Sequence, residues 1–219
     1  AVVTPDSANA NPSDWMGLLN RIEGKSFVKL TGDDAGVLVE RMRECWAGLG
    51  YRWFDRGDYN VNMFGIRGDD NTLGLLNDWL GLAYKVGGAW VVDLFAGSTD
   101  PGPHYEKNPV AQAKREGGVA ILEPGQYASY VLARHFGYPA VTQGRGSVSV
   151  MRDGVVDGKI TPGQRVHPGA FAINIHPVAR LNMIFGQAFK RGSAGCQVLA
   201  STDDHNKRWL AVIRRAVRA

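Results

Sequence analysis

The residues with the clearest chemical potential lie near the C-terminal end of the chain, where a cysteine follows a turn of small residues. Cys196 comes directly after Ser193-Ala194-Gly195, and His176 lies 20 positions upstream. Small residues let backbone N–H groups approach whatever the thiol contacts. A thiol, an imidazole and converging backbone amides are the parts of an acyl-transfer site. The sequence therefore raises the hypothesis of a cysteine nucleophile, Cys196, with a histidine base, His176.

The segment that leads to His176 alternates in hydrophobicity and predicts a strand. The apolar residues Phe171, Ile173 and Ile175 occupy alternate positions, and Asn174 and His176 lie between and after them. A period of two is typical of a strand with one buried face. We therefore expect Asn174 and His176 to project together, away from the core.

The same residues also have structural interpretations. Free cysteine is among the most buried residue types, so Cys196 could be a core thiol. His176 could be a half-exposed residue at a strand end. His205 is a rival base nine positions after Cys196. Its neighbours Asp203 and Asp204 favour a solvated position in the first turn of the last helix.

The remaining titratable residues give weaker signals. His135 is expected at a loop or helix end, with no partner that the sequence reveals. Asp93 stands inside an apolar strand and is the carboxylate most expected to be buried. The histidines have no HExxH or comparable spacing. A metal-dependent amidase or peptidase that uses His167, His176 and His205 stays open, but we expect no metal and no cofactor.

Composition indicates an ordinary globular protein. A chain of 219 residues favours one moderately large domain with enough length for a sizeable core. No apolar run approaches the roughly 20 residues that span a bilayer, so we expect no membrane span. The first residues lack a basic region followed by an apolar stretch, so we expect no signal peptide in this chain, although one could have been removed.

Charge and cysteine content narrow the possible partners. The 25 Lys and Arg exceed the 21 Asp and Glu by four, and no basic patch with interleaved aromatics suggests a nucleic-acid partner. A mild positive charge suits an anionic polymer such as a bacterial cell wall. Cys45 and Cys196 form no CxxC pair and no disulfide framework. We expect Cys45 to be a buried small hydrophobe in a helix.

The chain divides into three stretches. Residues 1–12 are small and polar, and we expect a flexible tail. Residues 13–50 contain two helical patterns, one that Gly24 ends and one that Thr31 opens with a capping-box spacing. We expect them to form a helical segment packed on the core. Residues 51–219 are rich in short strands and turn signals and form the main domain with a C-terminal helix.

Short strands and turn dipeptides dominate the main domain. We expect strands over 59–67, 89–96, 119–122 and 147–152, and helices over 69–82 and 127–136. Asp153-Gly154 predicts a hairpin turn. Ser201 or Thr202 caps the last helix, whose acidic start and basic end complement the helix dipole. The predicted fold class is α+β, with a mixed or antiparallel β core and peripheral helices.

The segment from His176 to Cys196 resembles the catalytic signature of L,D-transpeptidase-like cysteine enzymes. In that family a histidine is followed, after a spacer, by Ser/Thr-His-Gly-Cys and then an Arg or Asn. The longer stretch over residues 59–199, with STDPG, EPGQY, VMRD and INIHP, also resembles a group of bacteriophage and bacterial proteins with an NIH…SAGCQ pattern. This second resemblance covers about two thirds of the chain.

The resemblance implies an L,D-transpeptidase-like β-sandwich that acts on peptidoglycan. The Cys196 thiolate would attack a peptide carbonyl at the diamino-acid position of a stem peptide, and His176 would hold the thiolate as an ion pair. Backbone N–H groups of Gly195 and Cys196 would form the oxyanion hole, and the carbonyl of Pro177 would orient the imidazole. Ser193 and Asn174 would support the site.

Departures from the family pattern leave the outcome of the reaction open. Ala194 replaces the family's second histidine, and Val198 stands where an Arg often binds a carboxylate of the substrate. The spacer is longer than usual, and Pro177 replaces a small residue. Hydrolysis by a phage endolysin-like enzyme is expected first, with cross-linking or a non-catalytic cell-wall or virion component as alternatives. A papain-like hydrolase is disfavoured because it places the cysteine before the histidine.

Overall fold

The computed structural model describes residues 2–3, 23–161, 166–178 and 181–219. Of the tail expected over residues 1–12, it describes Val2–Val3, which form strand β1. The short helix expected before Gly24 lies outside the described residues.

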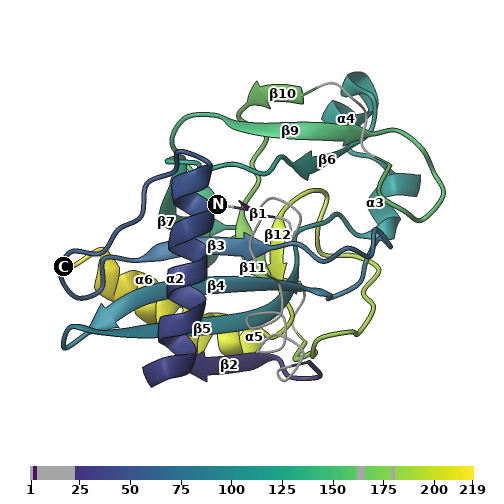
Figure 1. The fold of residues 1–219 in the computed structure, drawn as a ribbon. Coiled ribbons are helices and arrows are strands. Elements are labelled where there is room, and N and C mark those ends of the chain that lie inside the picture. Colours follow the sequence, from purple (N-terminus) through teal and green to yellow (C-terminus); the bar gives the residue numbers. More distant parts are fainter. Residues whose placement is uncertain (1, 4–22, 162–165, 179–180) are drawn as a thin grey trace.

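Two β-sheets form the body of the described chain (Figure 1). In these residues the larger sheet has nine strands, in the order β1-β3-β4-β5-β12-β11-β8-β7 with β2 paired to β5, and the smaller has the order β10-β9-β6. The strands are β1 (Val2–Val3), β2 (Phe27–Leu30), β3 (Asn62–Ile66), β4 (Asp78–Val86), β5 (Ala89–Ser98), β6 (Val119–Leu122), β7 (Tyr130–His135), β8 (Tyr138–Gln143), β9 (Val148–Asp153), β10 (Val166–Gly169), β11 (Ile175–Pro177) and β12 (Gln197–Leu199).

The larger sheet is mixed. Strands β3, β4 and β5 are antiparallel neighbours, whereas β11 and β12 run parallel. One edge of the long strand β5 takes two partners in succession, β2 opposite residues 92–95 and β12 opposite Gly97 and Ser98. The predicted α+β class with a mixed β core and peripheral helices is confirmed at this level.

Helices cover both faces of the larger sheet (Figure 1). They are α2 (Gly32–Gly48), α3 (Pro103–Lys107), α4 (Ala111–Glu116), α5 (Thr202–Asp204), the π-helical turn η2 (His205–Trp209) and α6 (Leu210–Ala216). On one face, Leu38 and Trp46 of α2 pack with Val92 and Val198. On the other, Trp209 packs with sheet residues that include Phe95, Ile175 and Leu199. The sheet is therefore buried between two apolar layers.

Burial on both faces explains why the helix expected over residues 69–82 is wrong. The segment enters strand β4 at Asp78, and residues 78–84 are all buried. Such a strand reads as a continuous apolar run, which periodicity alone does not distinguish from a buried helix. Gly74 has φ +77°, outside the helical region, and the Phe64 ring occupies the space over Gly81 that a side chain would need.

The helix expected over residues 127–136 is also wrong, because residues 130–135 form the strand β7. It is antiparallel to β8, with His135 opposite Tyr138. The two residues between the strands, Phe136 and Gly137, have φ of +43° and +86°. Positive φ at both positions is typical of the tight type I′ hairpin turn, so Gly137 completes a turn rather than ending a helix.

Two further expectations need correction. Within the predicted helical segment 13–50, residues 27–30 form strand β2, while α2 follows as expected and packs on the sheet. Asp153-Gly154 is not a two-residue hairpin, because β9 pairs with β10, which begins only at Val166. Asp153 instead stabilises the loop after β9, because its carboxylate accepts from the N–H groups of Val155 and Thr161.

Candidate functional site

The parallel pair β11–β12 brings the two predicted catalytic residues to neighbouring positions. His176 lies opposite Val198, so Cys196 is two residues along the neighbouring chain. The Gln197 N–H donates to the Asn174 carbonyl at 2.8 Å and extends the pairing towards Cys196. Because side chains alternate along strands, His176 shares a face of this pair with Val198, and Ile175 shares the opposite face with Gln197. A spacer of 20 positions is thus folded back by one strand pairing.

His176 is held by the contact that the resemblance implied. Its Nδ1 lies 2.8 Å from the carbonyl oxygen of Pro177. A carbonyl only accepts, so Nδ1 carries the hydrogen and Nε2 of the neutral ring keeps a free lone pair. Burial is the main cause that lowers the pKa of His176 to about 4, and the charges of His135 and His205 lower it further. At neutral pH the imidazole is therefore uncharged, with Nε2 available as a base.

The Cys196 thiol forms hydrogen bonds with the backbone of the segment that precedes His176. Sγ accepts from the Asn174 N–H at 3.4 Å and donates to the Ala172 carbonyl at 3.5 Å. Burial raises its pKa to about 11, against the lowering effect of the Asn174 N–H. Among the described residues no hydrogen bond joins Sγ to His176. The ion pair that the resemblance implied is therefore not the resting state that these pKa values favour.

Asn174 links the site to a second histidine that sequence reasoning left without a partner. Its Oδ1 accepts from the Gln143 N–H at 3.0 Å, which fixes Nδ2 as the donor to Nδ1 of His135 at 2.9 Å. The His135 ring stacks on the His176 ring, with centroids 4.7 Å apart and planes inclined by 23°. Only the β7–β8 hairpin brings His135 here. The Phe136-Gly137 turn was the sequence signal that could have indicated it.

The loop before Cys196 is closely packed. Ser193 Oγ donates to the Cys196 carbonyl at 2.7 Å and accepts from the Gly195 N–H at 3.0 Å. Gly195 has φ +136°, and a Cβ there would lie 2.7 Å from the Ala120 carbonyl oxygen, so only glycine fits. One of the two expected oxyanion donors is thus engaged. The Cys196 N–H has no hydrogen-bond partner among the described residues.

Several expectations about exposure are wrong. Asn174 and His176 are 5% and 4% exposed, so they do not project away from the core. The predicted strand over residues 171–176 is shorter, because regular pairing begins only at Ile175. His205 is fully buried rather than solvated, since the last helix packs its first turns against the sheet. The expectation that Asp93 is buried is confirmed, and it pairs with Lys29 at 2.8 Å.

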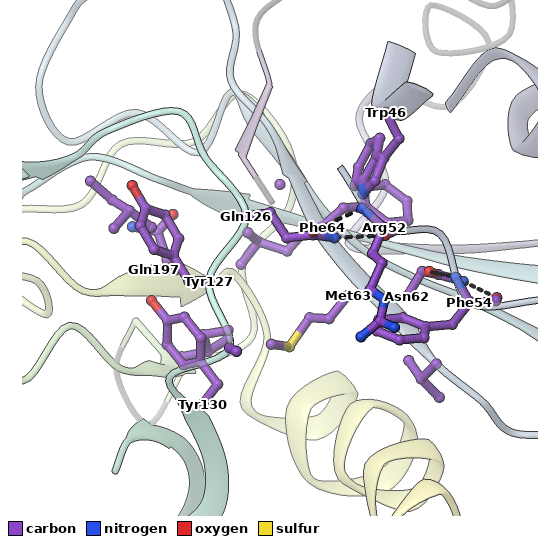
Figure 2. A pocket seen from close by; sticks show the side chains of 16 residues that line it. Trp46, Arg52, Phe54, Asn62, Met63, Phe64, Gln126, Tyr127, Tyr130 and Gln197 are labelled. Carbon is purple, nitrogen blue, oxygen red and sulfur yellow. Dashed lines mark hydrogen bonds between the residues drawn. The ribbon is translucent and has the colours of Figure 1, made fainter. Parts of the chain in front are cut away.

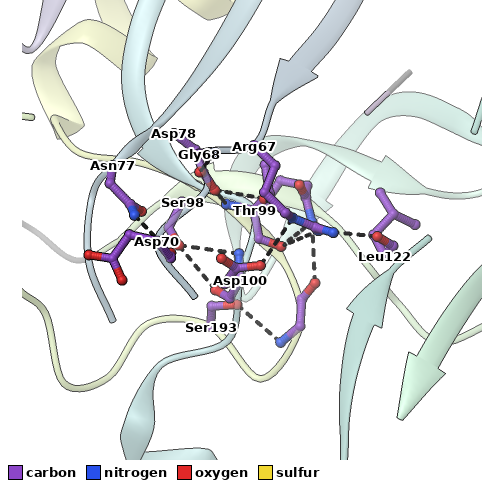
Figure 3. Close-up of polar contacts among 12 residues, drawn as sticks. Arg67, Gly68, Asp70, Asn77, Asp78, Ser98, Thr99, Asp100, Leu122 and Ser193 are labelled. Carbon is purple, nitrogen blue, oxygen red and sulfur yellow. Dashed lines mark hydrogen bonds and ion pairs between the residues drawn. The ribbon is translucent and has the colours of Figure 1, made fainter. Parts of the chain in front are cut away.

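A buried charge network lies next to the cysteine loop (Figure 3). Arg67 Nε is 3.2 Å from Asp100 Oδ1 and donates to Thr99 Oγ1 at 2.8 Å. Asp78 accepts from Gly68 N–H, Thr99 N–H and Thr99 Oγ1 at 2.6–2.7 Å. Burial and the Asp78 charge raise the pKa of Asp100 to about 7, although Arg67 lowers it.

Two contacts tie this network to the candidate site. Gln197 Nε2 donates to the Thr99 carbonyl at 3.2 Å, and the Gly102 N–H donates to the Ser193 carbonyl at 2.8 Å. Gln197 directly follows Cys196, and Ser193 lies in the loop that precedes it. The charge network therefore supports the loop that carries the thiol.

A pocket of about 370 Å³ adjoins the same strands (Figure 2). Its wall includes Ile175, between Asn174 and His176, and Gln197, directly after Cys196. Tyr127 and Tyr130 flank Gln197 on one side, and Trp46, Phe54 and Phe64 line the opposite side. The candidate catalytic pair thus sits beside a largely apolar pocket.

Metal and membrane signals were sought in the same residues. In the described part of the chain, no three His, Cys, Asp or Glu side chains gather in a way that could hold a metal ion. No helix in these residues is long and apolar enough to cross a bilayer.

Comparisons with known proteins add no family assignment. Searches against protein-family models, curated proteins and solved structures each gave no match.

Proposed function

We propose that this protein is a cysteine acyl-transfer enzyme of an L,D-transpeptidase-like β fold that acts on peptidoglycan. It cleaves stem-peptide or cross-link amide bonds through a thioester on Cys196. The observation that carries the proposal is the pairing of β11 with β12, which sets Cys196 beside a histidine whose Nδ1 is held by the Pro177 carbonyl. That contact leaves Nε2 free to accept a proton.

The pKa values define how such a pair would work. A partly buried thiol with a pKa near 11 and an imidazole with a pKa near 4 are both neutral at pH 7. His176 would then act as a general base during the attack rather than as the cation of a preformed pair. The thiol would first leave its bonds to Asn174 and Ala172.

The proposed reaction has two halves. Cys196 gives its proton to Nε2 of His176 as Sγ attacks the carbonyl carbon, and the Cys196 N–H stabilises the oxyanion. The C–N bond breaks, the leaving amine takes the proton from Nε2, and a thioester remains. Water then attacks the thioester and its proton passes through Nε2 to Sγ as the C–S bond breaks. A second stem amine in place of water would form a cross-link.

A second candidate function is cell-wall binding without catalysis. The observation that favours it is that the thiol is bonded to backbone groups and the Gly195 N–H is occupied by Ser193 Oγ. A protein of this kind would bind sacculi and leave their covalent structure unchanged.

Muropeptide analysis by mass spectrometry separates these functions. Purified cell wall is incubated with wild type, Cys196→Ala and Cys45→Ala, the last being a matched control at the other cysteine. We expect new muropeptides with wild type and Cys45→Ala, and at least a thousandfold slower release with Cys196→Ala, because removal of a nucleophile leaves only residual catalysis.

Each other outcome has a definite meaning. Release that survives in Cys196→Ala contradicts the proposal, and if it also disappears with a chelator, a metal-dependent amidase is indicated. Sacculus binding with an unchanged muropeptide profile supports the second candidate. New cross-linked dimers, rather than shorter stems, indicate transfer to an amine instead of water.

A further inference from the structure

The pocket beside the cysteine loop contains buried polar groups that no protein atom satisfies. It has a volume of about 370 Å³, and most of its wall is apolar or aromatic (Figure 2). The Tyr130 hydroxyl and Gln197 Oε1 are buried, and neither has a hydrogen-bond partner among the described residues. Gln197 as a whole is 2% exposed. Leaving such a group without a partner costs about 1–3 kcal/mol, so both are poised for a ligand or water.

The other polar side chains of the pocket are engaged in holding the fold. Gln126 bonds the backbone of Arg52 through both ends of its amide, at 2.8 and 2.6 Å. Asn62 bonds the backbone of Phe54 in the same way, at 2.8 and 2.7 Å. Tyr127 donates its hydroxyl to the Glu123 carbonyl at 2.7 Å. These groups shape the pocket, and Tyr130 and Gln197 remain for recognition.

The two free groups have complementary chemistry. Gln197 Nε2 donates to the Thr99 carbonyl, so the amide oxygen Oε1 is the atom that can accept a hydrogen bond from a ligand. Burial keeps the Tyr130 phenol protonated by raising its pKa, and it is therefore a hydrogen-bond donor. A secondary amide offers one N–H donor and one carbonyl acceptor, with apolar groups on either side. Among the described residues that line the pocket, Arg52 is the one that carries a charge, and it is exposed.

The pocket also lies within electrostatic reach of the thiol. Gln197 directly follows Cys196, and a negative charge on Cys196 contributes to the raised pKa of Tyr130. Cys196 and His176 do not line the pocket, and strand alternation makes Ile175 and Gln197 project from the face opposite to His176. A ligand that contacts both Tyr130 and Gln197 would therefore lie across the β11–β12 pair from the imidazole.

We propose that this pocket is a subsite for a secondary amide of the substrate, in which the Tyr130 hydroxyl donates to the amide oxygen and Gln197 Oε1 accepts the amide N–H. The inference names a binding group for the acyl-transfer substrate and rests on that proposed function. The amide could belong to a stem peptide or to the acetamido group of an amino sugar, and both are uncharged at this point.

Binding is tested on the Cys196→Ala protein, in which no thioester can form. The probes are O-acetyl-D-lactyl-D-alanine, which has one secondary amide, and the matched ester O-acetyl-D-lactyl-D-lactate, which has none but keeps the same carboxylate. Affinity is measured by NMR chemical-shift titration, with the side-chain amide signals of Gln197 as a local reporter. We expect the ester to bind about three- to tenfold more weakly, the effect of one neutral hydrogen bond.

Two tyrosine variants in the same background complete the test. Tyr130→Phe should weaken the amide probe about three- to tenfold, whereas Tyr84→Phe, which lies outside the pocket and whose hydroxyl donates to Asp93, should leave the affinity unchanged. A thermal unfolding curve checks each variant, and if Tyr130→Phe does not fold, the amide–ester comparison decides. N-Acetylglucosamine and glucose form a second probe pair, and selective binding of the acetamido sugar assigns the amide to the glycan strand.

The proposal fails if the ester binds as tightly as the amide, if Tyr130→Phe binds as tightly as its parent, or if no amide probe binds. None of these results concerns turnover at Cys196. Loss of muropeptide release in Cys196→Ala together with unchanged probe affinity in Tyr130→Phe would retain the acyl-transfer function and reject the subsite. Amide binding without any turnover would retain the subsite in a non-catalytic protein.

Discussion

Two clusters of polar side chains adjoin each other in this protein, and their hydrogen-bond partners differ in kind. In the charge network, Arg67 pairs with Asp100 and donates to Thr99, and Asp78 accepts from Thr99 and Gly68 (Figure 3). In the candidate site, Cys196 and His176 each have hydrogen bonds to backbone groups and none to each other in the described structure.

The difference teaches how burial can produce either rigidity or reactivity. Arg67 pairs with Asp100 and opposes the rise that burial causes in the pKa values of Asp78 and Asp100, and the network anchors the β5 end to the cysteine loop. Without a counter-charge, burial makes the thiol and the imidazole neutral by moving their pKa values apart. The first cluster has little freedom to react. The second keeps a lone pair and a thiol that can exchange one proton.

The largest expected effect comes from removing the cation of the network. Arg67→Met leaves Asp78 and Asp100 buried without a positive partner, and we expect a loss of about 3–5 kcal/mol in the free energy of unfolding. Urea unfolding at pH 7 measures it. His176→Gln is the matched change in the other cluster and should cost less, because it removes a neutral ring with one hydrogen bond to the Pro177 carbonyl and a stacking contact with His135 but leaves no buried charge without a partner. Equal losses would erase the distinction between the clusters.

The next effect concerns the reactivity of the thiol. With a pKa raised to about 11, Cys196 holds about three-hundredfold less thiolate at pH 7.5 than an ordinary cysteine with a pKa of about 8.5. Iodoacetamide should therefore alkylate Cys196 of the Cys45→Ser protein slowly at pH 7.5, with a rate that rises tenfold per pH unit up to about pH 10. Mass spectrometry follows the reaction. Fast alkylation that is flat above pH 6 would instead indicate the ion pair with His176.

A smaller effect concerns the protonation of Asp100 and the pH dependence of stability that follows from it. Because the pKa of Asp100 is raised to about 7, the folded state binds a proton that the unfolded state releases above about pH 4. The stability contributed by this group therefore falls as pH rises from about 4 to about 7. Asp100→Asn does not titrate, so its stability relative to wild type should increase between pH 5 and pH 8, by on the order of 2 kcal/mol. Parallel pH–stability curves would show that Asp100 is ionised throughout.

The smallest expected effect is in the stacked histidine pair. The charge of His135 contributes to the low pKa of His176, though less than burial does. In His135→Gln the pKa of His176 should therefore rise slightly above about 4, which an NMR pH titration of the ring protons measures. Arg134→Gln serves as a control at a neighbouring residue and should leave that titration unchanged. A lowered pKa of His176 in His135→Gln would contradict this prediction and would mean that the His135 ring stabilises the protonated form of His176.

Local sequence signals predicted those parts of the site that depend on neighbours in the chain. The small residues before Cys196 form the expected turn, with Gly195 at a φ that requires glycine. Ser201 caps the last helix by accepting from the Asp204 N–H, as expected. The strand over residues 119–122 has the predicted bounds. Each of these depends on contacts within a few residues.

Errors arose where a segment's environment comes from distant parts of the chain. Strand β4 was taken for a helix because both of its faces are buried, which removes the alternation that marks a strand. His205 was expected to be solvated because its neighbours are acidic, but η2 packs against the sheet and encloses it. His135 had no visible partner because the hairpin that carries it was not recognised.

The sequence by itself determined which groups are available: a thiol in a glycine-rich turn, a histidine 20 positions before it, and a helix with its own cap. Tertiary structure alone decided their state. The β11–β12 pairing brought Cys196 to two residues from Val198, the partner of His176, and burial set the pKa values of Cys196 and His176 at about 11 and about 4. Strand register and desolvation depend on segments far apart in the chain, so local patterns of residue types do not predict them.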